Sequence, residues 1–174
     1  QITRAAILLF GKTPQLHFSM AQIHMGRFKD STTIVDDKLI YGNLFQQIQQ
    51  VLPIFQQYLN VRYEIPDEAK DQTGTEIFQR HEIWDYPLDA LREAVLNALV
   101  HRDYLVPGDI QIRVYEDHLS IANPGELPEG ITIEDLAREE HASIPRNPLI
   151  AQVFYFASLV ERWGSGTLRI ARAC

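Results

Sequence analysis

The chain has 174 residues, 45% hydrophobic and 22% charged, a composition typical of a globular protein with a sizeable core. Its net charge of −7 argues against tight non-specific DNA binding, which depends on Lys and Arg neutralising phosphates. A single cysteine excludes an internal disulfide, and no apolar run is long enough to span a membrane. We therefore expect a cytoplasmic protein and, because the chain starts at Gln1 without a methionine, a piece of a longer one.

The first half of the chain predicts three strand-like or extended segments and two helices. In chain order they are a short helix (3–11), a strand (17–28), a strand or extended segment (33–42), a long helix (43–60) and a strand (61–65). Gly11 and Pro14 should stop the short helix, and Asn43 is placed to cap the long one. Pro53 lies inside the long helix and should kink or divide it.

The second half begins after a polar loop at residues 66–76. The pattern there predicts a strand (76–84), a long helix (87–103), a hairpin (109–123) turning at Glu116 and Asp117, a short helix (131–141), a third long helix (147–163) and a last helix from residue 167.

Together these elements predict an α/β two-layer sandwich, in which a mixed, mainly antiparallel sheet carries the long helices on one face. We expect an N-terminal α/β portion at residues 1–75 that extends the sheet, and a second domain at residues 76–174.

The triplet at residues 11–13, Gly-Lys-Thr, ends like a phosphate-binding Walker A loop. The full motif needs a glycine five residues earlier, where this chain has Ala6, and it must follow a strand and open a helix. Here a helical segment precedes the triplet and Pro14 follows it, so we interpret Gly11 as a helix stop.

The stretch REAVLNALVHRDY places an acid, an amide and an imidazole, Glu93, Asn97 and His101, four residues apart along one side of a helix. Such a line is either part of a solvated helix surface or the wall of a pocket. In a nucleotide site the carboxylate would accept a proton from water, and the amide oxygen would hold Mg²⁺.

Two glycine loops follow in the sequence. In IANPGELPEG, the run Asn123-Pro124-Gly125 is either a plain turn or a place where backbone approaches a flat ligand closely. In ERWGSGTLRI, Gly164 and Gly166 are either a helix stop or the start of a helix whose free amides face phosphate.

These motifs, with IPRNPLIAQVF, closely resemble the C-terminal region of bacterial and archaeal proteins labelled RecG-related ATP-dependent DNA helicases, also described as transcriptional regulators with a Schlafen/AlbA-like N-terminal domain. That region in turn resembles the GHKL ATPase fold of gyrases and histidine kinases. The resemblance covers nearly the whole chain, and it implies a nucleotide site that binds ATP and Mg²⁺.

The resemblance also implies a role for each matching residue. Glu93 would be the general base and Asn97 the Mg²⁺ ligand, and residues 126–163 would correspond to the ATP lid. The remaining residues implied to bind nucleotide are Asn123 and Gly125 of the first glycine box, Gly164 and Gly166 of the second, and Arg146 in the lid span.

The sequence departs from the GHKL pattern in its glycine boxes. Asn123 stands where that family has an aspartate that reads the adenine amino group, Pro124 stiffens the first box, and Leu168 replaces a small residue in the second. Two hypotheses therefore remain: an ATP-binding regulatory domain with slow hydrolysis, or an interaction or dimerisation module with an inactive pocket. In both, DNA contact comes from domains outside this chain, which has no helicase motor motifs.

Overall fold

The computed structural model describes residues 3–64, 81–128, 130–136, 144–160 and 166–174. The described elements are α1 (Arg4–Phe10), the 3₁₀ helix Pro14–Leu16, β1 (Ile23–Phe28), β2 (Ile34–Ile40), α2 (Leu44–Tyr58), β3 (Val61–Glu64), β4 (His81–Trp84), α3 (Leu88–His101), β5 (Ile110–Val114), β6 (Leu119–Ala122), α4 (Ile133–Leu136), α5 (Pro148–Phe156) and α6 (Gly166–Ala173). Within these ranges, every helix falls short of the length and apolarity that crossing a membrane requires.

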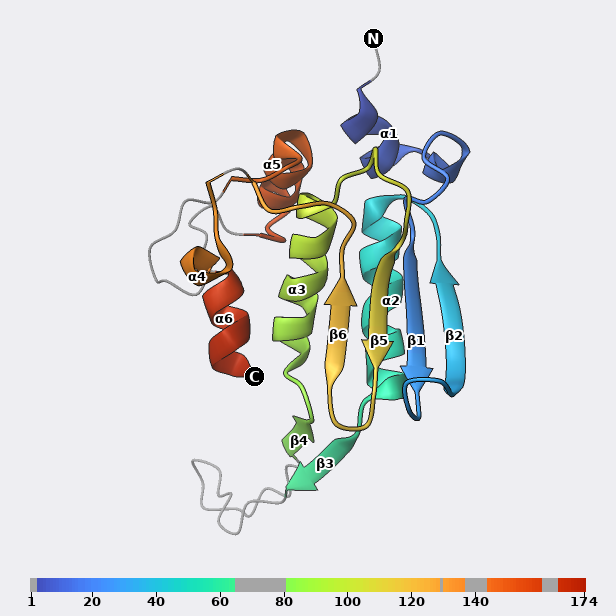
Figure 1. Cartoon of the computed structure of the whole chain (residues 1–174), viewed down its shortest axis with the longest axis vertical. Helices are drawn as coiled ribbons and strands as arrows, with labels where there is room; N and C mark the ends of the chain where they lie inside the picture. The colour runs from blue at the N-terminus through green and yellow to red at the C-terminus, as the bar shows by residue number, and fades with distance from the viewer. Residues whose placement is uncertain (1–2, 65–80, 129, 137–143, 161–165) are drawn as a thin grey trace, which may run out of the picture.

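A four-stranded sheet in the order β2-β1-β5-β6 forms the centre of the fold (Figure 1). The outer pairs β1–β2 and β5–β6 are antiparallel, whereas the central pair β1–β5 is parallel. The central pair joins strands from the two halves of the chain, so both halves share one sheet. The predicted mixed, mainly antiparallel sheet is confirmed.

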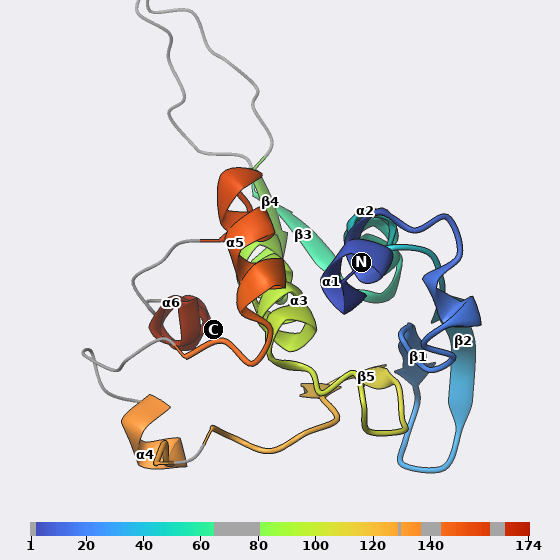
Figure 2. The ribbon, with the colours of Figure 1, turned by 90° about the horizontal axis from the view of Figure 1, so that it is seen from above.

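The helices lie on one face of this sheet, as predicted (Figure 2). Strand residues alternate in burial: Ile23 and Met25 of β1 and Ile110 and Ile112 of β5 are fully buried toward the helices. The apolar face of α2 and that of α3 pack against them in one continuous core. This arrangement leaves the side of α3 that turns away from the sheet for other contacts.

Of the two outcomes expected for Pro53, a kink or a division of the long helix, the division does not occur, since α2 runs from Leu44 to Tyr58. The proline ring is exposed, and the carbonyl left without its helical partner belongs to Gln49, which is also exposed, so water can bond it. Asn43 caps the helix, and its side chain accepts a hydrogen bond from the N–H of Gln46.

The first predicted strand is too long at its N-terminal end. The 3₁₀ helix Pro14–Leu16 and a turn occupy the stretch before β1, which starts only at Ile23. The N–H of Phe18 bonds the carbonyl of Pro14, and the N–H of Ala21 bonds that of Phe18, so these backbone groups are satisfied locally and not by a strand partner.

The third long helix is also shorter than expected, since α5 ends at Phe156 and does not continue to residue 163. Ser158 takes a positive φ of 56°, and the N–H of Leu159 bonds the carbonyl of Phe154 while that of Ser158 bonds Tyr155. This pair of bonds is a Schellman motif, which usually carries glycine. Serine in that place gave no sequence signal for a stop.

The strands β3 and β4 form a separate antiparallel ribbon that leads from α2 to α3 (Figure 1). The expected domain boundary at residue 75 and the residues 76–80 of the expected strand lie outside the described residues.

Arg102, directly after α3, is only 2% exposed and ties α3 to the sheet. Its guanidinium donates to the carbonyls of Met20, Gln22 and Gly108, at 2.6, 3.3 and 2.6 Å. Burial lowers the pKa of Arg102, but a guanidinium stays protonated in proteins, so the group remains charged. The segment before β1 and the segment before β5 are thus held to the end of α3 by one buried cation.

We predict that Arg102→Leu destabilises the fold by at least about 3 kcal/mol, because the three hydrogen bonds that hold the segments before β1 and β5 to the end of α3 would be lost. Chemical unfolding followed by circular dichroism measures this. The exposed Arg113 provides the control, and Arg113→Leu should change the free energy of unfolding by less than about 0.5 kcal/mol. Equal effects of the two substitutions would refute the role given to Arg102.

Candidate functional site

The acid–amide line lies along α3 at the edge of the core. Leu91, Val95 and Leu99 of this helix are buried, whereas Glu93, Asn97 and His101 are half-buried. Their four-residue spacing places the three polar side chains on one side of the helix. This side is the one against which α6 packs.

Gly166, the first residue of α6, lies directly against this line. A Cβ atom at Gly166 would overlap Oε1 of Glu93 and lie 3.1 Å from Nδ2 of Asn97. The second glycine motif, about seventy positions away in the sequence, is therefore in contact with the acid and the amide. The absence of a side chain lets the start of α6 approach them this closely.

The first glycine loop lies at the C-terminal end of α3. Gly125 has a φ of 122°, and a Cβ there would lie 3.1 Å from Cβ of Asp103 and 3.6 Å from Nε of Arg146. The N–H of Asp103 donates to the carbonyl of Pro124 at 2.9 Å. Glycine is required here both for its φ and for the close approach to Asp103.

Arg146 forms a bridge between three segments. Its Nη1 donates to Oδ2 of Asp103 at 3.1 Å, and its Nη2 donates to the carbonyl of Glu126 at 2.7 Å. The sequence suggested Arg146 as a phosphate contact, which stays a prediction. The structure adds that an acid, Asp103, already neutralises this arginine.

Asp103 and Asn147 are site residues that sequence reasoning missed. Asn147 donates from Nδ2 to the carbonyls of Val100 and Arg102, at 2.8 and 2.7 Å, and so satisfies the end of α3 from 45 residues away. Only the position of Asp103, directly after the acid–amide helix, gave a signal, and nothing local marked Asn147.

Asn123, at the end of β6, carries a buried polar atom without a partner. Its Oδ1 is shielded from solvent and accepts no hydrogen bond from any residue that the structure describes. Buried acceptors are nearly always paired in proteins, whereas the orientation of this amide is not fixed by a hydrogen bond at its buried end.

The predicted site residues thus form two groups along one helix. Glu93, Asn97 and Gly166 form the first, and Gly125 and Arg146 form the second around Asp103. Asp103 follows Asn97 by six positions, just beyond the end of α3, and six positions correspond to about 9 Å along a helix axis. Gly164 lies outside the described residues, so its position stays a prediction.

The described residues contain no cluster of three or more His, Cys, Asp or Glu side chains that is able to hold a metal ion. A dedicated metal cage is therefore not offered by this part of the chain. The donor set at α3, one amide oxygen beside one carboxylate, fits Mg²⁺ of the kind that takes few protein ligands and completes its shell with phosphate oxygens and water.

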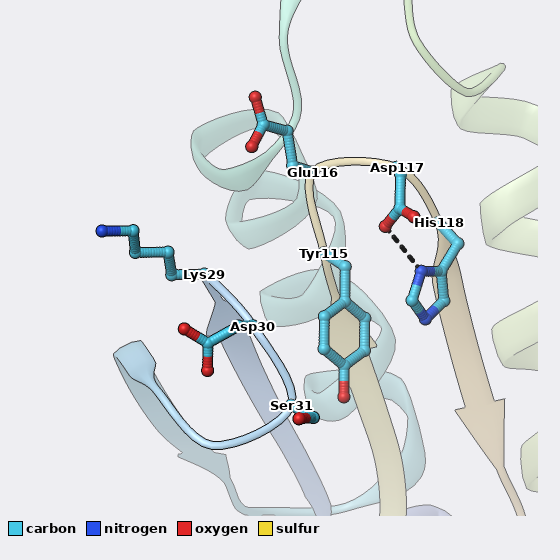
Figure 3. Close-up of a pocket in the computed structure, with 7 residues that line it drawn as sticks. All are labelled: Lys29, Asp30, Ser31, Tyr115, Glu116, Asp117 and His118. Carbon is cyan, nitrogen blue, oxygen red and sulfur yellow. Dashed lines mark hydrogen bonds and ion pairs between the residues drawn. The ribbon is translucent and has the colours of Figure 1, made fainter.

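A hollow of about 580 Å³ opens at the other end of the sheet, between the β1–β2 loop and the β5–β6 turn (Figure 3). It is lined by Lys29, Asp30, Ser31, Tyr115, Glu116, Asp117 and His118. His118 stacks on Tyr115 at 4.2 Å and bonds Asp117 at 2.7 Å.

Asp30 in this hollow accepts hydrogen bonds from Thr32 and Thr33, which hold its pKa down at about 2. The Asp30 carboxylate therefore stabilises its own turn. The hollow contains none of the site residues predicted from the sequence and is separate from the candidate site.

Comparison with known families addresses the second half of the chain. Residues 108–174 match the family model described as "Putative ATP-dependent DNA helicase recG C-terminal". These residues are similar to a RecG-related C-terminal, ATPase-like region. The resemblance inferred from the sequence is confirmed at this level. The RecG-related region includes Asn123, Gly125, Arg146 and Gly166, whereas Glu93 and Asn97 precede it.

Comparison with solved structures addresses the fold. The chain is similar to the crystal structure of the DIP2311 protein from Corynebacterium diphtheriae, with a TM-score of 0.77 and 22% sequence identity over 99% of this chain. The chain spans 32% of the length of that protein's chain. At this identity the similarity supports the fold alone. A search of curated proteins gave no match.

His101 provides a test of the burial of the polar line. Burial and then the positive charge of Arg146 lower its pKa below the ordinary 6.5. The unfolded chain therefore takes up a proton near pH 6.5, before the folded chain does, so stability is full above that pH and falls as the pH drops toward the folded pKa.

We predict that His101→Asn flattens this loss of stability below about pH 6.5. Unfolding free energies measured between pH 5 and 8 would show it. The same substitution at the exposed His17 should leave the pH profile of the wild type unchanged. A His101→Asn profile identical to that of the wild type would contradict the prediction.

Proposed function

We propose that this chain is an ATP-binding regulatory domain of a RecG-related protein, with slow hydrolysis of ATP in the presence of Mg²⁺. The observation that carries the proposal is the contact of Gly166 with both Glu93 and Asn97. It unites a carboxylate, an amide and a helix start, which are the parts needed to handle phosphates. The ATPase-like family of residues 108–174 supports the same conclusion.

The phosphates would lie at the start of α6. The first N–H groups of a helix lack partners within the helix and carry partial positive charge, so they attract anions. Gly166 opens this helix without a side chain that would block the amides. Gly164 would extend the same loop, whereas Arg146, which lies beside Gly125 in the second group, would contact the nucleotide at its other end.

Glu93 and Asn97 would act on the terminal phosphate. The Glu93 carboxylate would accept a proton from an attacking water, and Asn97 would offer its amide oxygen to Mg²⁺. When bound, Mg²⁺ neutralises phosphate charge. Half-burial keeps both side chains close to the helix surface and limits their conformations, so their spacing is preset.

The base would lie at the other group of residues. Asn123 ends β6 with its unpaired Oδ1, and Gly125 provides a flat stretch of backbone beside Asp103. A nucleotide with phosphates at α6 and base at the β6 end would lie along α3. This orientation uses every predicted site residue that the structure describes.

The regulatory part of the proposal concerns DNA and assembly. The net charge of −7 disfavours a direct role in binding duplex DNA, so DNA contact would come from other parts of the protein. Nucleotide binding would then control either that contact or the formation of a homodimer, as in a transcriptional regulator.

We predict that Asn97→Ala weakens binding of Mg·ATP by about 10- to 100-fold, the effect of losing an interaction with a charged partner. Isothermal titration calorimetry measures this. The exposed Asp89 on the first turn of the same helix provides the control, and Asp89→Ala should bind as the wild type does. Absence of binding by the wild type at millimolar Mg·ATP would overturn the proposed function. It would favour the alternative, an interaction or dimerisation module with an inactive pocket.

We predict that Glu93→Gln lowers ATP turnover by about 10² to 10⁴-fold with little change in affinity, because the amide cannot accept the proton from water. Phosphate release under saturating Mg·ATP measures turnover, with Asp89→Asn as the matched acid-to-amide control. Turnover unchanged in Glu93→Gln would remove Glu93 as the general base.

We also predict that Gly166→Ala reduces turnover by at least about tenfold, because the new Cβ would displace the Glu93 carboxylate from its position. The end of the Glu93 side chain can move, so the fold should survive, as a thermal melt would show. Ala171→Ser, on an exposed position of the same helix, should be neutral. Full activity in Gly166→Ala would show that the contact is not functional.

A further inference from the structure

Asn123 has an amide whose two ends lie in different environments. Its Oδ1 is buried and has no partner, whereas its Nδ2 is accessible and makes no hydrogen bond with any residue that the structure describes. A side-chain amide offers an acceptor at one end and donors at the other. The protein therefore fixes where the amide sits without fixing which of its ends faces outward.

Rotating the amide by 180° exchanges the two ends at little cost. Oxygen and nitrogen are nearly the same size, and their assignment follows from hydrogen bonds alone. In the orientation that the structure records, the buried end gains no bond from the described part of the chain. A ligand at this position would therefore select the orientation by its own hydrogen-bonding group.

Adenine and guanine differ at the group that would meet Asn123. Adenine has an amino group that donates, and guanine has a carbonyl oxygen that accepts. With Nδ2 outward, as in the structure, the amide suits the guanine carbonyl. With Oδ1 outward it suits the adenine amino group. An aspartate in this place would only accept, so it would favour adenine and repel the guanine oxygen.

We infer that Asn123 makes this a purine-nucleotide site that binds adenine and guanine nucleotides with affinities within about tenfold of each other. The inference rests on the proposed function, because it requires a nucleotide with its base at the end of β6. It goes further, because it assigns base selectivity to one residue and predicts that GTP or GDP is also a ligand.

Base selectivity is tested by titrating the whole chain with ADP and with GDP, each with Mg²⁺, in a calorimeter. The expected dissociation constants for the wild type differ by less than about tenfold. A preference of the wild type for ADP greater than tenfold would overturn the inference and leave the ATP site intact. Absence of binding by both nucleotides would instead overturn the proposed function itself.

The variant Asn123→Asp tests whether this residue sets the selectivity. The ratio of the GDP to the ADP dissociation constant should rise by at least about tenfold, because the carboxylate has no donor for guanine. Gln56→Glu, which adds the same charge at an exposed position of α2, should leave the ratio unchanged. An unchanged ratio in folded Asn123→Asp would overturn the role of Asn123.

Asn123→Ala keeps the test decisive if the buried carboxylate prevents folding, which circular dichroism would show. This variant should weaken ADP and GDP by similar factors and keep the ratio of the wild type, because it removes the donor and the acceptor together. Loss of affinity for ADP alone would contradict the inference.

Discussion

The buried guanidinium of Arg102 is the interaction on which the arrangement of the site depends. It holds the carbonyls of Met20, Gln22 and Gly108, and thereby fixes the end of α3 to the starts of the two central strands. A buried cation is costly without hydrogen-bond partners. The three carbonyls bind its two terminal nitrogens at defined positions, whereas its Nε has no partner among the described residues. The next residue, Asp103, is placed by the same contact and meets Pro124 and Arg146.

Held at its C-terminal end by Arg102, α3 positions both groups of residues in the candidate site. Its apolar face is buried against the sheet, and its half-buried polar line faces α6. The rigid helix sets the spacing between the Glu93–Asn97 group and the Asp103 group. The absence of a side chain at Gly166 and at Gly125 lets the backbone approach the first and the second group closely. Two loops far apart in the sequence thus become parts of one elongated site.

Asn123 shows how a single departure from a known pattern changes what a site can recognise. The GHKL resemblance implies a carboxylate at this position, whose acceptors suit one kind of base edge. The amide presents either a donor or an acceptor, and its unpaired Oδ1 leaves the choice to the ligand. Loss of strict adenine reading is therefore compatible with a working nucleotide pocket, and it does not by itself favour an inactive module.

The sequence by itself determined the features that depend on short-range chemistry: the Asn43 cap, the β5–β6 hairpin, the four-residue spacing of Glu93 and Asn97, and the glycine loops. The family resemblance linked these motifs to one pocket. Only the tertiary structure decided that Gly166 contacts Glu93, that Arg146 pairs with Asp103 across 43 residues, and that Ser158 ends α5. These features depend on packing between distant segments, and local periodicity and turn propensity carry no information about such packing.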